Sequence, residues 1–447
     1  MKTSFFKITA AAVVFASTLT YAQKAPSNIR EYLAPEKYER NIFEDPKIEA
    51  PEYQGVKVSI GGDFALQFQG LDHETKGNLG FVKDAQGNNT TTPIELVNLG
   101  ADFNLPTANL DVNAYLAKGV KLHLRTYLSA RHHNEAWVKG GYLQIDNLDF
   151  IKEGFLGDIM KHARIKVGMD ELNYGDSHFR RSDNAETINN PFVGNLIMDN
   201  FTTEPFGEVY VFYNNFIGMV GVSNGKLNQT PVEGTNDNKP SIYAKVGYDK
   251  QMNEDLRIRL TGSVMSTNGL STGGYLYGAD RAGSRYYYTL LTTQDALGTS
   301  NYATGRFNPG FRELTAIQFN PFVKYKGLEF FGTYEHVSGN KLLNGKLRDS
   351  DGSYNQLGAE LLYRFGNKEK LYFGGRYNSV SGQDFDGQDK RKIDRFNLGG
   401  GWFMTPNILA KLEYVNQKYD QSTAWGTTSA LYGGQFNGIM LEATIGF

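Results

Sequence analysis

Hydrophobic and polar residues alternate along most of the chain with a period of two, which is typical of β-strands with one apolar face. The first such stretch starts at Val56, where apolar residues alternate with polar residues such as Lys57 and Ser59. The same alternation returns in residues 110–116, 120–128, 163–170, 256–264 and 439–447. This pattern predicts an all-β chain with many strands.

Two classes of connection separate these predicted strands. Short turns are expected at residues 118–119, 214–215, 326–327, 366–370 and 405–407. Long polar loops are expected at residues 70–93, 171–207, 224–240, 267–312 and 419–435. Transmembrane β-barrels have short periplasmic turns and longer extracellular loops, whereas a soluble β-sandwich has no reason to alternate them. We therefore predict a transmembrane antiparallel β-barrel with long extracellular loops and short periplasmic turns.

Counting strands back from the last residue, Phe447, gives sixteen, and both ends of the chain then fall on the short-turn side. Closure leaves no edge strand whose backbone groups lack partners in lipid. The least regular stretch is residues 94–117, where Pro106 interrupts the alternation. We treat it as one long or broken strand, and eighteen strands is the alternative. Aromatic residues expected at or near strand ends, at headgroup depth, are Tyr325, Phe365, Tyr377, Trp402, Tyr414 and Phe447.

The chain before residue 56 has a different character. Basic residues, an apolar run and small residues up to Ala22 predict a cleaved signal peptide over residues 1–22. Residues 23–55 are charged and contain four prolines, so they are predicted to form a mostly irregular N-terminal extension on the periplasmic side. The sequence leaves open whether this extension binds a partner or enters the lumen. The barrel is predicted for residues 56–447.

Composition supports one large β unit. The 447 residues include 50 Gly, 27 Tyr and 29 Phe, which suits many strands and turns. The absence of Cys excludes disulfides, thiolate metal sites and a cysteine nucleophile. The formal net charge of −2 gives no indication of nucleic-acid binding.

The signal, the alternating strands and the final Ile445-Gly446-Phe447 together resemble outer-membrane porins over residues 56–447. Three stretches of the sequence are similar to porins of the Bacteroidetes, a group related broadly to the phosphate-selective porins. They are KVGMDELNYGDSHFRRSDN from Lys166, FVGNLIMDNF from Phe192 and GMVGVSNGKL from Gly218. The resemblance implies the outer membrane of a Gram-negative bacterium, with its lipid and lipopolysaccharide. It also implies recognition of the C-terminal strand by the barrel-insertion machinery, and a homotrimer.

In sixteen-stranded porins the loop after the fifth strand folds into the barrel, and here that position falls on residues 171–207. The resemblance therefore implies a constriction loop. Its densest cluster of charges consists of Asp176, His178, Arg180, Arg181, Asp183 and Glu186. An ordinary salt-bridged loop is the alternative. The longer loop, residues 267–312, is expected to be a second plug or an external cap.

Alternation also assigns charged residues to the lumen. The basic positions are Lys57, Lys121, Arg125, Arg164, Lys166, Lys245, Arg257, Arg259, Lys324, Arg364, Arg376, Arg395 and Lys411. The acidic positions are Asp63, Asp111, Asp146, Asp170, Glu329, Glu335, Glu360, Glu413 and Glu442. The pore wall opposite the constriction loop is predicted to contain Lys121, Arg125, Arg164, Lys166, Arg257 and Arg259. We hypothesise a preference for anions; the alternative is that these charges only hydrate the pore and pair with carboxylates.

The function expected from this barrel is passive diffusion of small hydrophilic solutes, without a cofactor, catalytic residues or a metal site. A different class of function is that of a β-barrel scaffold for adhesion or assembly, which acts through its loops and N-terminal extension. A barrel enzyme would need a nucleophile with a partner at one strand end. Residues 221–225 match G-x-S-x-G around Ser223, but no helix is predicted to follow, as that motif requires. The chain is therefore predicted not to be an enzyme.

Overall fold

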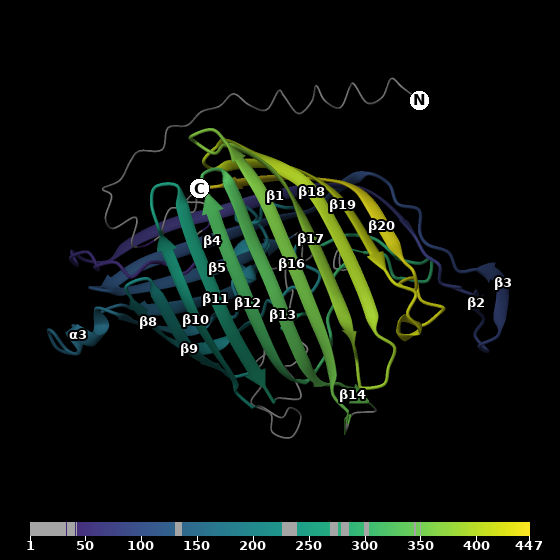
Figure 1. The fold of residues 1–447 in the computed structure, drawn as a ribbon, viewed down its shortest axis with the longest axis horizontal. Coiled ribbons are helices and arrows are strands. Elements are labelled where there is room, and N and C mark those ends of the chain that lie inside the picture. The colour runs from purple at the N-terminus through teal and green to yellow at the C-terminus, as the bar shows by residue number, and fades with distance from the viewer. Residues whose placement is uncertain are drawn as a thin grey trace.

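The last strand, β20 (Gln435–Gly446), pairs antiparallel with the first, β1 (Lys57–Glu74), and this pairing closes a sixteen-stranded barrel (Figure 1). The structure is a computed structural model that describes residues 33, 41, 43–129, 136–225, 239–268, 276–278, 286–298, 304–343, 346–348 and 350–447. Sixteen strands are confirmed, and the alternative of eighteen is wrong. The predicted signal peptide lies outside the described residues.

The strands follow one another around the barrel in chain order. Between β1 and β20 they are β4 (Asp102–Ala117), β5 (Val120–Ser129), β6 (Ala136–Ile145), β7 (Ala163–Glu171), β8 (Thr203–Tyr213), β9 (Phe216–Ser223), β10 (Ser241–Gln251), β11 (Leu256–Thr267), β12 (Glu313–Tyr325), β13 (Leu328–Asn340), β16 (Gly352–Phe365), β17 (Leu371–Gln383), β18 (Arg391–Thr405) and β19 (Ile408–Tyr419). Small hairpins in the loops are formed by β2 (Phe81–Lys83) with β3 (Asn89–Pro93) and by β14 (Leu342–Leu343) with β15 (Lys346–Leu347).

The C-terminal residue takes part in closing the barrel. Phe447 N donates to Gly62 O at 3.0 Å, and Gly62 N donates to Phe447 O at 3.1 Å. A Cβ atom at Gly62 would lie 2.6 Å from Asn109 O and 3.0 Å from the Phe447 ring. Glycine is therefore required where the last residue and the neighbouring strand approach β1 this closely.

The two ends of the barrel differ in their connections. We call the end that holds Phe447 the short-turn end and the opposite end the long-loop end. Most connections at the short-turn end are tight, but residues 146–162 between β6 and β7 form a long one that includes α3 (Gly157–Met160). Figure 1 shows α3 projecting from one end and the β2–β3 hairpin from the other. The predicted asymmetry is therefore present with one exception at the short-turn end.

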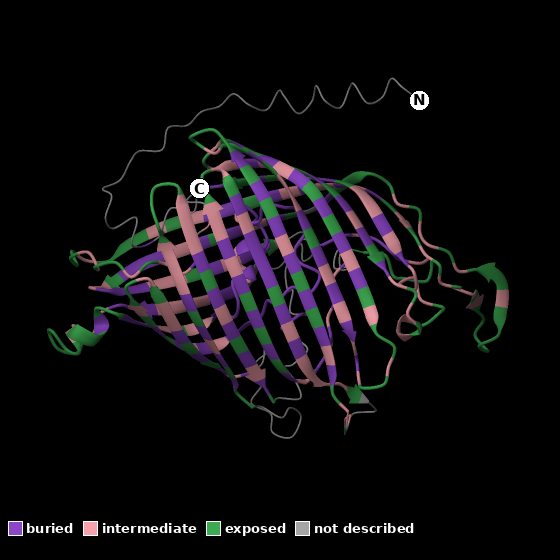
Figure 2. Ribbon diagram, in the orientation of Figure 1, coloured by how far each residue is buried: buried purple, intermediate pink, exposed green. Residues whose placement is uncertain are grey.

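Burial along each strand is the reverse of that in a soluble protein. Apolar side chains such as Val211, Val220 and Val246 are exposed on the outer face, while the interior contains charged side chains such as Arg395 and Glu335. Figure 2 shows this as alternating bands along the strands. The pattern is that of a transmembrane barrel, whose apolar face meets lipid. No helix among the described residues is long and apolar enough to cross a membrane.

Three details differ from the sequence-based expectations. Pro106 does not break its strand, because β4 accommodates it in a bulge opposite Leu66, between the Ala65 and Gln67 pairings. The loop predicted to end at Gly207 ends before Thr203, since pairing with β7 extends β8 backwards. Lys57 is exposed because it is the first residue of β1 at the barrel mouth.

The six predicted aromatic residues all lie on the exposed outer face. Four of them are at or near strand ends, whereas Tyr377 and Tyr414 lie in the middle of β17 and β19. The prediction that these two residues lie near strand ends is therefore wrong, because each stands six positions after the first residue of its strand, Leu371 or Ile408.

Candidate functional site

Residues 172–202, which connect β7 to β8, the fifth and sixth strands of the barrel, are mostly buried and contact side chains of the barrel wall. Wall side chains bind the backbone of this loop. Ile197 N donates to Asn378 Oδ1 at 2.6 Å, and Val193 N donates to Glu413 Oε2 at 2.7 Å. Buried backbone groups outside regular structure need such partners. The loop is therefore fastened to β17 and β19, far around the barrel from its own strands.

Two of the predicted loop charges bind the wall formed by β10–β16. Asp176 is fully buried and accepts from Arg259 Nε at 2.8 Å. Arg180, in the short helix η1 (Ser177–Arg180), donates to Glu329 at 2.8 Å and to Glu360 at 2.9 Å. These contacts bring together residues that are between 83 and 180 positions apart in the chain.

Two further loop charges bind the opposite wall, formed by β5 and β6. Asp183 lies 2.8 Å from Lys139 Nζ, and Glu186 accepts from Arg125. The acidic loop residues therefore contact basic wall residues directly and are not separated from them by open lumen. The sequence offered two interpretations of this segment, an inserted loop and a salt-bridged loop, and the segment has features of both.

The last two predicted loop residues bind near the loop itself. His178 Nδ1 lies 2.9 Å from Glu171 Oε1, and Arg181 donates to Asp199 at 2.7 Å. All six predicted residues thus lie within one inserted loop that crosses the lumen from one wall to the other.

The second long loop packs onto the first from the long-loop end. Phe307 N donates to Ile197 O at 2.7 Å, and Phe201 N donates to Leu276 O at 2.8 Å. Tyr287 is fully buried. The described parts of residues 267–312 therefore act as a second plug, one of the two possibilities that the sequence left open.

The N-terminal extension also enters the lumen. We call Asn41 and Phe43–Lys47 the lumenal segment. Arg259 Nη2 donates to Glu44 Oε2 at 2.6 Å, and Lys121 Nζ donates to Asp45 Oδ2 at 3.1 Å. The sequence left this location open, because nothing in a proline-punctuated stretch shows which distant cations it will meet.

The two carboxylates of the lumenal segment are held ionised. Burial by itself raises the pKa of Glu44, but the cations of Lys245 and Arg259 hold it well below the ordinary value. Burial likewise opposes ionisation of Asp45, and Lys121, Lys166 and Arg164 hold the pKa of Asp45 well below the ordinary value. Docking of the segment is therefore stabilised at neutral pH and weakened when these groups take up protons.

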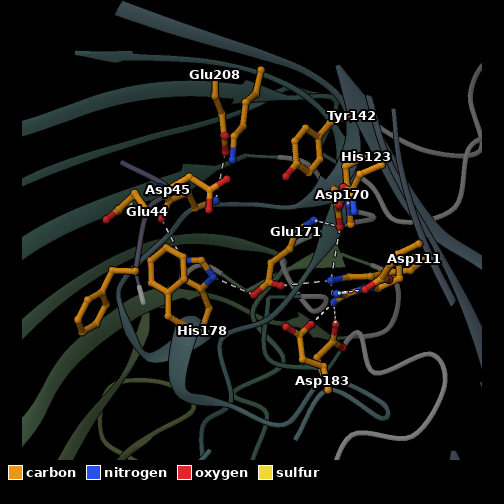
Figure 3. Close-up of a pocket in the computed structure, with 18 of the residues that line it drawn as sticks. Glu44, Asp45, Asp111, His123, Tyr142, Asp170, Glu171, His178, Asp183 and Glu208 are labelled. Atoms are coloured by element: carbon orange, nitrogen blue, oxygen red, sulfur yellow. Dashed lines mark hydrogen bonds and ion pairs between the residues drawn. The ribbon is translucent and has the colours of Figure 1, made fainter. Parts of the chain in front are cut away.

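A cavity of about 290 Å³ remains between the inserted loop, the lumenal segment and the wall of β4–β8. Its lining carboxylates are Glu44, Asp45, Asp111, Asp170, Glu171, Asp183, Glu186 and Glu208, and its lining lysines and arginines are Lys121, Arg125, Lys139, Lys166 and Arg181. Figure 3 shows Glu44, Asp45 and Glu208 on one side, with Asp111, Asp170 and Asp183 on the other. With the segment in place, this passage carries more acidic than basic side chains.

The predicted wall cations divide into two groups. Lys121, Arg125 and Lys166 line the cavity, whereas Arg164, Arg257 and Arg259 do not line it but contact the lumenal segment, as Lys121 also does. The predicted acidic lumen positions are all buried. Their faces could be assigned from the sequence because alternation continues through nearly every strand.

The sequence analysis missed three lumenal charges in two strands. Lys139 on β6 and Glu204 and Glu208 on β8 are buried. The exposed Val138 and Val209 beside them are the signal that could have located Lys139 and Glu208. Alternation places the neighbours of an outward-facing valine on the inner face.

The catalytic-looking Ser223 ends β9 and donates to Glu204 at 2.5 Å. The prediction that no helix follows this motif falls on residues 226–238, which lie outside the described residues. Among the described residues, histidine, aspartate and glutamate side chains form no group suited to a metal ion. Ser223 is therefore explained by its hydrogen bond between two neighbouring strands.

No family model matches this sequence, and no curated protein matches it. Solved structures of outer-membrane proteins do match. The outer membrane channel DcaP of Acinetobacter baumannii has a TM-score of 0.51 and 13% identity, over 90% of this chain and 100% of that chain. An anion-selective porin from Comamonas acidovorans has a TM-score of 0.49 and 12% identity, over 88% of this chain and 100% of that chain. OmpT of Vibrio cholerae has a TM-score of 0.48 and 10% identity, over 90% of this chain and 100% of that chain. The likeness to DcaP shows that this chain has a porin-like barrel fold.

Proposed function

We propose that this chain is an outer-membrane porin through which small hydrophilic solutes diffuse passively. The observation that carries the proposal is a cavity lined by charged side chains, beside an inserted loop, inside a barrel whose outer face is apolar. The proposal includes export through the predicted signal peptide and insertion through the C-terminal strand. It also includes assembly as a homotrimer, with apolar outer faces meeting each other or lipid.

Selectivity is part of the same proposal. The wall cations favour anions, but many of them are paired with carboxylates. Two of the eight carboxylates that line the passage, Glu44 and Asp45, belong to the lumenal segment. We therefore propose that anion preference depends on the segment leaving the lumen, and that the docked state does not prefer anions.

Single-channel recording of the purified protein in planar bilayers tests the function. We expect conductance steps in KCl, and the reversal potential under a salt gradient reports the preferred ion. Absence of conductance from protein whose folded barrel is shown by a heat-shifted gel band would contradict the proposal.

A scaffold function is a second candidate, because the connection at residues 146–162 exposes an apolar surface at the short-turn end. Its exposed apolar side chains are Phe150, Ile151, Phe155, Leu156 and Ile159. Exposed groups of this kind often mark interaction sites. Replacing Phe150, Ile151 and Ile159 by serine should abolish an association with the cell envelope while leaving conductance unchanged; retained association would contradict this second function.

A further inference from the structure

The lumenal segment crosses the barrel interior. At one end, Asn41 Nδ2 donates to Glu329 Oε2 on β13 at 2.9 Å. At the other, Lys47 Nζ donates to Asp146 Oδ1, directly after β6, at 2.9 Å. Strands β7 to β12 lie between these two contacts along the wall. The described residues of the segment therefore cross the lumen between these two parts of the wall.

Adjacent carboxylates of the segment bind cations from different parts of the wall. Glu44 is bound by Lys245 of β10 at 3.1 Å and by Arg259 of β11 at 2.6 Å. Asp45 is bound by Lys121 of β5 at 3.1 Å. The positions of these cations therefore match two successive acidic residues of a peptide.

The wall also recognises the backbone of the segment. Arg164 donates to Asp45 O at 2.7 Å and to Pro46 O at 3.1 Å, and Arg257 donates to Asn41 O at 3.0 Å. These bonds depend on a peptide carbonyl and not on a particular side chain. They distinguish an extended peptide from a simple inorganic anion.

An apolar position precedes the two acidic ones. Phe43 is 5% exposed, and its ring centroid lies 5.4 Å from that of Phe322 and 5.8 Å from that of Phe179. Arg259 stacks on the Phe43 ring, 4.2 Å from its centroid. The surroundings therefore accept an apolar side chain followed by two carboxylates.

The cations of this site are also held by residues outside the segment. Arg164 donates to Asp146 at 2.8 Å, Arg257 to Asp249 at 2.7 Å and Arg259 to Asp176 at 2.8 Å. These partners would keep the guanidinium groups oriented if the segment left. A preorganised site of this kind binds its ligand without a large ordering cost.

We propose that Lys121, Arg164, Lys245, Arg257 and Arg259 form a binding site for acidic peptides, which the chain's own lumenal segment occupies in this structure. The inference rests on the proposed channel function and names a solute class for it. Because the segment is tethered to β1, its effective concentration is high, and it closes the site to solutes until it is released. Release takes two carboxylates and three backbone carbonyls away from these cations. The open channel therefore takes peptides with an apolar residue followed by adjacent carboxylates.

The test uses three full-length proteins: the wild type, the double variant Glu44→Lys/Asp45→Lys and the double variant Glu49→Lys/Glu52→Lys. The first variant places two positive charges against the wall cations and should expel the segment. The second makes the same charge change in the same extension, at exposed residues. We expect larger conductance only for the first variant, and a heat-shifted gel band confirms that each barrel is folded. If the first variant fails to fold, Glu44→Gln/Asp45→Asn replaces it.

A capped peptide with the sequence of residues 41–47, Asn-Ile-Phe-Glu-Asp-Pro-Lys, is then added on both sides of the bilayer. We expect it to block the expelled variant at a concentration at least tenfold lower than the same peptide with Gln and Asn in place of Glu and Asp. The wild type should resist block. Equal conductance of the three proteins, or equal block by the two peptides, would overturn this inference while leaving the channel function intact. Absence of conductance from all three folded proteins would overturn the channel function itself.

Discussion

The lumen contains two irregular segments that both form ion pairs but differ in how much apolar packing they add. The inserted loop, residues 172–202, is covalently anchored by a strand at each end and buries apolar side chains, including Phe192, Ile197 and Met198. The lumenal segment continues into the barrel only at β1, contributes one buried aromatic ring and is held mainly by ion pairs. Ion pairs respond to pH and competing charge, whereas apolar packing does not. Because packing and a second strand anchor add to its ion pairs, we expect the inserted loop to be a permanent constriction and the lumenal segment to be a removable one.

The largest effect is expected from breaking the ion network of the permanent constriction. In Arg180→Ala, two buried ion pairs break at once: Glu329 would keep only Arg364, and Glu360 would keep only Arg376. Breaking a buried pair costs about 3–5 kcal/mol, so we expect a clearly lower urea midpoint in detergent. Lys161→Ala, which breaks an ion pair whose side chains are 69% and 97% exposed, is the control. Equal midpoints for the two variants would show that this network does not stabilise the loop.

The next largest effect is expected at the apolar anchor of the lumenal segment. Phe43→Ala removes a buried ring, which typically costs about 3 kcal/mol in a protein core. Amide hydrogen exchange in residues 43–47 should accelerate by about a hundredfold, since each 1.4 kcal/mol corresponds to about a factor of ten. Tyr53→Ala, at a residue that is 40% exposed, should leave that exchange unchanged. Protection that persists in Phe43→Ala would mean that ion pairs alone hold the segment.

Low pH should release the lumenal segment while the inserted loop stays in the lumen. The pKa values of Glu44 and Asp45 are lowered by docking, so docking is stabilised above their ordinary values and weakens as pH falls below about 4.5. Each carboxylate contributes at most about 1.4 kcal/mol per pH unit. Conductance should therefore rise between pH 6 and pH 3. Glu44→Gln/Asp45→Asn should lack this rise, and an equal rise in that variant would assign the response to other groups.

The smallest effect is expected at the end of the segment. Lys47→Ala removes one ion pair with Asp146, which keeps Arg164 as a partner. The loss should be about 1 kcal/mol, typical of one hydrogen bond, and amide exchange in residues 43–47 should accelerate by about fivefold. An acceleration as large as that of Phe43→Ala would show that Lys47 is a main anchor.

Alternation identified most wall residues correctly, because lipid outside and water inside impose opposite polarity on successive positions of every strand. Arg259 and Glu335 could therefore be assigned to the lumen from their neighbours alone. The same rule failed at Lys57, where the strand emerges from the barrel and both faces meet water. It would have located Lys139, had β6 been recognised as a strand.

The sequence by itself determined the class of fold and the sidedness of most connections, and it favoured sixteen strands over eighteen. These features depend on local periodicity and on chain order, which the sequence contains directly. Only the tertiary structure decided that Glu44 meets Lys245 and Arg259, residues 201 and 215 positions away in the chain. An irregular segment has no period that assigns it a face, so its location depends on which distant charges the closed barrel brings within reach.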